Sequence, residues 1–222
     1  MADTFERSED LIEALRESLA VSAERALTDL GKEGGFSDSE VFKIKLPESV
    51  ETFRKPLALV NKDSLLDDFE GTMNRAAEAG VAASPAIIKK VIQETTLEDL
   101  TELWQGEEDA ITRFLEKRSR DELSAKMEPI IAKATDASGA TSTYKRIKNS
   151  LPESTGGLFS QFQSFTGIGK GVNFDLDAYV NEKALDGLFM AMAAEEKTLR
   201  ENPLARSTDL LKKLFDSTAL GD

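Results

Sequence analysis

Residues 167–171, Gly-Ile-Gly-Lys-Gly, resemble a phosphate-binding loop, in which backbone N–H groups and a lysine hold a nucleotide. Two members of that pattern are missing. Ser164 stands where the first glycine belongs, and Gly171 stands where Ser or Thr would hold magnesium. No strand pattern precedes the segment, so we predict a surface loop here and not a nucleotide site.

Residues 173–177, Asn-Phe-Asp-Leu-Asp, place oxygen ligands at alternate positions, as a calcium loop does. An EF-hand would then need Gly at position 178 and Glu at position 184, but the chain has Ala178 and Ala184. Asp175 or Asp177 more simply caps the helix that follows. We therefore predict no metal site in this segment.

Ser142 and Lys145 have the S-x-x-K spacing of serine acyl enzymes, but the companion K-T-G motif is absent. Paired carboxylates such as Glu107–Glu108 and Glu195–Glu196 can hydrolyse glycosides only at a set separation within a cleft. Runs of charge on helices are usually solvated faces. We predict that none of these groups is catalytic.

Polar residues beside apolar helical stripes are the better candidates for a site. Asn74, Arg75 and Glu78 are flanked by small residues that permit a close helix contact. Lys183 and Asp186 lie one turn apart on another helical stripe. Two interpretations stay open: ion pairs between helices, or the polar lining of a groove that takes a ligand. For Arg75 we predict a carboxylate partner on the later helix, either Glu182 or Asp186.

Composition excludes much other chemistry. The chain has 222 residues, no Cys and no His, which removes Ser–His–Asp triads, Cys nucleophiles, disulfides and the usual zinc and iron–sulfur ligands. It has 28 basic and 41 acidic residues, a net charge of −13, and a pI near 4.7. Such a charge argues against nucleic acid as a partner. No apolar run is long enough to span a membrane, and we expect no cofactor and no bound metal.

The hydrophobic pattern predicts an all-α protein, a single irregular multi-helix domain with one short extended segment near residues 41–46. From the N-terminus, we expect a first helix at 8–30, a loop and the extended segment at 31–47, helices within 48–134, an irregular Gly- and Phe-containing stretch at 137–172, and C-terminal helices at 176–216. Gly31 marks a helix end, Asn202–Pro203 marks the end of one helix and the start of the last, and Ser84–Pro85 marks a helix start. Glu196 and Arg200, one turn apart, are expected to pair.

In the extended segment, Phe42, Ile44 and Leu46 fall on one side and need an apolar cover, from a helix layer or from a partner chain. Phe159, Phe162 and Phe165 form a row at three-residue spacing, flanked by glycines. Aromatic side chains in such a segment must cover the core, a ligand or a partner. We therefore include all three in the predicted ligand- or partner-binding set.

Several segments together carry a family resemblance: 30–36 (Leu-Gly-Lys-Glu-Gly-Gly-Phe), 41–47, 73–78 (Met-Asn-Arg-Ala-Ala-Glu), 179–189 and 195–215. With them, the chain resembles the bacterial family known as domain of unknown function 4197, over roughly residues 10–215. The resemblance implies a helical protein, usually made with a secretory signal in Gram-negative bacteria. It implies no activity, ligand or catalytic residue. The stretch 150–171 departs from the pattern by its length.

A secretory signal is not visible before residue 10, and we expect that it has been removed, which favours a periplasmic location over a cytoplasmic one. We predict a non-catalytic binding or interaction module that holds an apolar or amphipathic small molecule or docks a partner protein. A homo-oligomer is compatible with the sequence. The alternative is a hydrolase that uses carboxylates or a hard metal ion.

Overall fold

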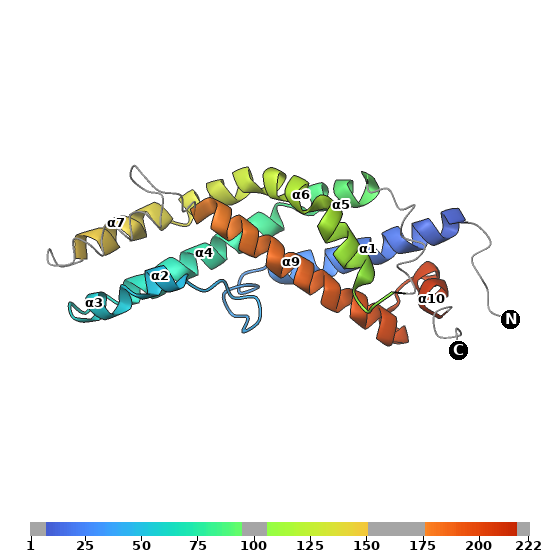
Figure 1. Ribbon diagram of the computed structural model, residues 1–222, viewed down its shortest axis with the longest axis horizontal. Helices are drawn as coiled ribbons and strands as arrows, with labels where there is room; N and C mark the ends of the chain where they lie inside the picture. Colours follow the sequence, from blue (N-terminus) through green and yellow to red (C-terminus); the bar gives the residue numbers. More distant parts are fainter. Residues whose placement is uncertain (1–7, 95–105, 151–175, 217–222) are drawn as a thin grey trace. The chain divides into compact units, whose positions relative to one another are not determined.

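The computed structural model describes residues 8–94, 106–150 and 176–216 (Figure 1). These residues form α1 (Ser8–Leu30), α2 (Glu48–Glu51), α3 (Arg54–Ala58), α4 (Ser64–Ala82), α5 (Pro85–Glu94), α6 (Ala110–Ala137), α7 (Ala140–Ser150), α9 (Leu176–Glu201), the 3-10 turn η3 (Pro203–Ala205) and α10 (Asp209–Asp216). No strand occurs in the described ranges, and the all-α class is confirmed. Residues 159, 162, 165 and 167–171, which carried sequence predictions, lie outside them.

Local signals account for several helix ends. The first helix has the predicted bounds, and α5 begins with Pro85 directly after Ser84, whose carbonyl accepts the N–H groups of Ile87 and Ile88. Proline suits the first helical position because its missing N–H has no partner there in any case. Gly31 follows α1 but does not have the positive φ expected of a glycine cap, which among the described glycines occurs at Gly34 and Gly139.

Two segments differ from expectation. Residues 140–150, inside the stretch predicted to be irregular, form α7, because Gly139 (φ +90°) turns the chain after α6 and a new helix begins at once. The last helix begins at Asp209, several residues after the predicted stop at 202–203. The side chain of Asn202 accepts the N–H of Leu204 and stabilises η3 in between.

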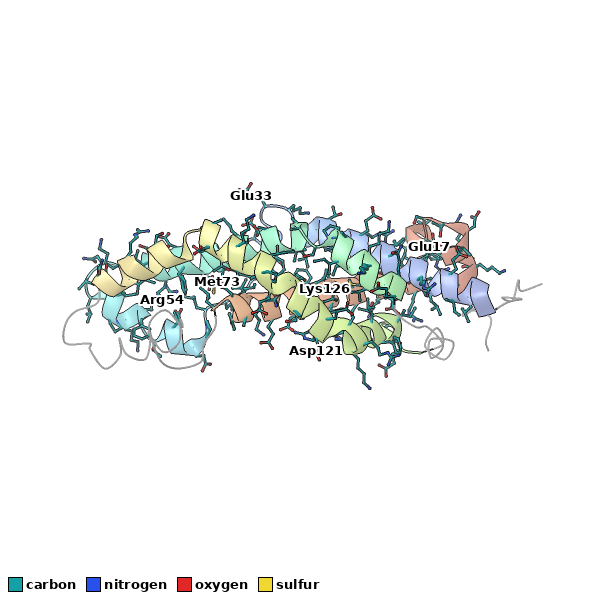
Figure 2. The ribbon with its side chains drawn as sticks, turned by 90° about the horizontal axis from the view of Figure 1, so that it is seen from above. Glu17, Glu33, Arg54, Met73, Asp121 and Lys126 are labelled. Atoms are coloured by element: carbon teal, nitrogen blue, oxygen red, sulfur yellow. The ribbon has the colours of Figure 1, made fainter. Side chains whose placement is uncertain are left out.

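The described helices group into two compact units. Of the described residues, unit 1 comprises 8–29, 84–94, 106–125 and 185–216, and unit 2 comprises 30–83, 126–150 and 176–184. The core of unit 1 includes Leu15, Leu19, Ile111, Leu115, Leu188, Phe189, Leu199 and Phe215. The core of unit 2 includes Phe36, Phe53, Leu57, Leu66, Phe69, Met73, Ile131 and Val180. Figure 2 labels Met73, whose side chain is fully buried. The expectation of a single domain stays a prediction.

The segment at 43–47 has neither helix nor strand hydrogen bonding. Ile44 and Leu46 are buried while Lys43 and Lys45 are exposed, so the predicted alternation of covered and solvated side chains is confirmed. Phe42, the third apolar residue of that set, is half-buried in a turn. The backbone of this segment is fastened by side chains of α4.

Candidate functional site

Three polar side chains of α4 in unit 2 recur at intervals of four residues: Glu70, Asn74 and Glu78. This spacing places them on one face of the helix, one turn above another. Asn74 is fully buried and Glu78 is 6 % exposed, which is unusual for a carboxylate. Buried polar groups must find hydrogen-bond partners, and here the partners lie in residues 36–46.

Asn74 binds both backbone groups of Ile44. Its Oδ1 accepts the Ile44 N–H at 2.9 Å, and its Nδ2 donates to the Ile44 carbonyl at 2.9 Å. Nδ2 also donates to the carbonyl of Glu70 within α4. One amide therefore satisfies a residue that would otherwise bury an unpaired N–H and an unpaired C=O.

Glu78 holds the preceding turn of the same loop. Its Oε1 accepts the N–H of Phe36 at 3.1 Å and both the N–H (3.0 Å) and the hydroxyl (2.8 Å) of Ser37. A buried carboxylate with three donors is well compensated for the loss of water. The fully buried Phe36 ring is positioned by these bonds.

The third member of the row, Glu70, fastens the far end of the segment. Its Oε2 accepts the Leu46 N–H at 3.2 Å, and its Oε1 lies 3.2 Å from the Lys43 ammonium. From α9, the Tyr179 hydroxyl donates to the Lys45 carbonyl at 3.1 Å. The α4 clamp, as we name Glu70, Asn74 and Glu78, thus replaces the strand pairing that the extended segment lacks.

Unit 1 uses a buried carboxylate in the same way. Glu196 of α9 is 1 % exposed and accepts the N–H of Ile111 at 3.2 Å and of Thr112 at 2.7 Å. These are among the first N–H groups of α6, which have no partner within the helix and carry its positive dipole end. Arg200 donates to the same carboxylate through Nε at 3.0 Å and Nη2 at 2.8 Å, so the predicted pair of Glu196 and Arg200 is confirmed.

A buried arginine binds the C-terminal end of α9, which also lies in unit 1. Arg206 donates to the carbonyls of Leu199 (2.8 Å) and Arg200 (2.6 Å) in the last turn of α9, and it also pairs with Asp216. Guanidinium donors suit these carbonyls and the negative end of the helix dipole. The Arg200 and Arg206 guanidiniums lie 5.4 and 5.6 Å from the centre of the Phe215 ring, which attaches α10.

Asp186, a predicted site residue, belongs to an ion-pair chain on the surface of unit 1. It pairs with Arg120, which also donates to Glu116 at 2.8 Å. Partial burial lowers the pKa of the Arg120 guanidinium, but the hydrogen bonds and charges of Asp186 and Glu116 together outweigh that effect and the pKa is raised. The pKa of Lys197 is raised as well, mainly by its hydrogen bond to Glu108 at 2.7 Å.

The predicted site residues that the structure describes are divided between the two units. Asn74 and Glu78 share one face of α4, as expected. Arg75 is exposed and donates to the Thr72 hydroxyl at 3.5 Å. It makes no ion pair with Glu182 in the part of the chain that the structure describes, so that predicted pair is wrong, while the pair with Asp186 stays a prediction. Lys183 is half-buried in unit 2, while Asp186 falls in unit 1.

Sequence reasoning missed Glu70 and Arg206. Glu70 could have been found, because it continues the four-residue spacing of Asn74 and Glu78. Arg206 carries no such signal, since its partners are backbone carbonyls. The hydroxyl of Ser142, from the S-x-x-K motif, donates to the carbonyl of Gly139, three residues earlier in the chain, at 2.8 Å.

Within residues 8–94, 106–150 and 176–216, no group of three or more acidic side chains is placed to hold a metal ion. Among the helices in these ranges, none has the length and apolar character needed to cross a bilayer.

Fold and site together define an all-helical protein in which buried polar side chains hold the chain's own backbone. It belongs to the family of proteins of unknown function DUF4197, whose model matches residues 6–216. No curated protein and no solved structure matches the chain.

Proposed function

We propose that this protein is a non-catalytic binding module of the periplasm, and that unit 2 holds an apolar or amphipathic small molecule. The observation that carries the non-catalytic part is the engagement of three buried polar side chains by the backbone. Asn74, Glu78 and Glu196 each bind backbone N–H groups of another segment. A carboxylate that holds the backbone of another segment is committed to that contact, which does not favour its use as a general base.

Unit 2 is the better candidate to hold the ligand, because the segment with the three phenylalanines follows α7, a helix of unit 2. α7 packs against α4, and Arg146 lies 3.4 Å from Asp68, so α7 ends at Ser150 near the start of α4 (Figure 1). The segment with Phe159, Phe162 and Phe165 follows directly in the chain. In this proposal the three rings contact the ligand, Arg75 and Lys183 serve its polar end, and Asn74 and Glu78 act by holding the loop.

The test is a titration of the full chain with 1-N-phenylnaphthylamine, an apolar probe whose fluorescence rises when it leaves water. Phe162→Ala should weaken probe binding about tenfold, the worth of burying part of one aromatic ring, with little change in the free energy of unfolding. Phe114→Ala, the same truncation at a half-buried ring in unit 1, is the control and should leave probe binding unchanged.

Two results would reject the proposal. One is a stability loss of about 3–5 kcal/mol in Phe162→Ala with unchanged probe affinity, because the ring would then be core. The other is hydrolysis of a glycoside or ester by the purified protein, stimulated by Ca²⁺ or Mg²⁺, which would establish the hydrolase alternative. Osmotic-shock fractionation of cells that make the native protein tests the periplasmic location.

A further inference from the structure

The turn between α3 and α4 presents two neighbouring apolar side chains to solvent. Leu59 is 85 % exposed and Val60 is 37 % exposed. The other large apolar side chains exposed in the described ranges, such as Leu204 and Met190, have no exposed large apolar neighbour in the chain. Singly exposed apolar residues are ordinary on a protein surface, but an adjacent pair at the tip of a turn is a candidate contact.

The backbone of this turn is fixed by its own hydrogen bonds. The Lys62 N–H donates to the Leu57 carbonyl at 2.9 Å, and the Asn61 N–H donates to the Ala58 carbonyl at 3.0 Å. Asn61 has φ +56°, the left-handed conformation that completes a Schellman motif. Leu59 and Val60 are thus held outward by a turn that needs no partner to form.

Positive charge predominates within the turn itself, between Glu51 and Asp63, although the whole chain is acidic. Residues 52–62 contain three basic residues and no acidic one, in a protein of net charge −13. Arg54, labelled in Figure 2, is engaged with Glu51 and Asp67. Lys55 and Lys62 are exposed and have no ion pair in the part of the chain that the structure describes.

We propose that the turn at residues 55–62, which we name the α3 tip, docks on an anionic lipid bilayer. Leu59 and Val60 enter the boundary between headgroups and acyl chains, while Lys55 and Lys62 remain among the phosphates. Two apolar side chains give only a shallow anchor. The acidic remainder of the chain is repelled by the same surface, so attachment is confined to the tip, reversible and weakened by salt.

Flotation of the full chain with vesicles tests this docking. The vesicles are phosphatidylcholine alone, or phosphatidylcholine with phosphatidylglycerol. The protein should float with the mixed vesicles at low salt, and not with phosphatidylcholine alone. Lys55→Gln with Lys62→Gln should lower partitioning roughly twentyfold or more, because each lysine near an anionic leaflet contributes about fivefold. Leu59→Ser with Val60→Ser should abolish flotation, and neither pair should unfold the protein because all four side chains are exposed.

Matched controls keep the result specific. Leu204→Ser removes an apolar side chain that is 95 % exposed in unit 1, and Lys89→Gln with Lys133→Gln removes the same charge at other exposed sites. Both should float like the unaltered chain. Equal loss in these controls, or no flotation of the unaltered chain, would overturn the proposal. So would a dimer in sedimentation that Leu59→Ser with Val60→Ser converts to monomer, since the tip would then contact a second copy. The assay is independent of the proposed ligand, which the naphthylamine titration reads separately.

Discussion

Gly80 of α4 lies directly against the side chain of Ile131 of α6, within unit 2. A Cβ at position 80 would collide with the Cδ1 of Ile131 and come within 3.1 Å of its Cγ1. Gly80→Ala should therefore lower the free energy of unfolding by about 1–3 kcal/mol, because a packed core resists added volume. Urea unfolding followed by circular dichroism measures the change.

A second glycine of the same helix is the control. A Cβ at Gly71 would approach only Nη1 of Arg75, at 3.2 Å, which is the flexible end of an exposed side chain. Gly71→Ala should be neutral or stabilise by up to about 1 kcal/mol through helix propensity. Ile131→Val removes the colliding methyl, so it should cost less in the Gly80→Ala background than alone. Additive losses would contradict the collision.

Replacing the amide of the α4 clamp tests how the loop is held. Asn74→Ala should lower the free energy of unfolding by about 2–5 kcal/mol, because the N–H and C=O of Ile44 each lose their buried partner. Asn74→Asp should be comparably harmful, since a carboxylate can accept from the N–H but repels the carbonyl. Asn149→Ala, at an exposed position of α7, should change stability by less than about 0.5 kcal/mol. A loss below about 0.5 kcal/mol in Asn74→Ala would show that other contacts hold the loop.

The sequence predicts the helices well where the apolar stripe is long. α1 and α9 begin and end where the pattern places them, because stripe and stop signals coincide at Leu30 and at 202–203. α7 was not predicted because its sequence is rich in polar residues, as a loop is; among its side chains that the structure describes, Thr143 and Ile147 are buried.

The sequence identifies polar residues of the candidate site, but not the groups that they bind. Spacing marks Asn74 and Glu78 as polar residues on a buried face, but their partners are backbone groups 30 and 42 residues away. A backbone N–H has no sequence signature, so the pattern could not distinguish a clamp for a loop from the lining of a groove. The ion pair predicted between Arg75 and Glu182 is wrong for a related reason: periodicity gives a face only approximately, and one residue of rotation moves a side chain to solvent.

Neighbouring glutamates of α9 should differ sharply in their effect on unit 1. Glu196→Ala leaves the N–H groups of Ile111 and Thr112 and the guanidinium of Arg200 without their carboxylate, and should cost about 3–5 kcal/mol. Glu195→Ala removes a partly exposed pair with Arg25 at 3.0 Å and should cost at most about 1 kcal/mol. Guanidinium-induced unfolding of both variants makes the comparison. Similar losses in the two would mean that the Glu196 contacts do not support the start of α6.

The left-handed residue of the α3 tip gives the last test, which concerns the backbone alone. Asn61 at φ +56° tolerates this conformation better than most residues, but glycine has no Cβ to strain there. Asn61→Gly should leave stability unchanged or raise it by a few tenths of a kcal/mol, and Asn61→Ala should lower it by about 1 kcal/mol. Asn149→Gly, within α7, is the control and should not stabilise, because that backbone is helical. Thermal unfolding of the three variants decides the matter: destabilisation by Asn61→Gly would contradict a Schellman end for α3, and with it the fixed outward display of Leu59 and Val60.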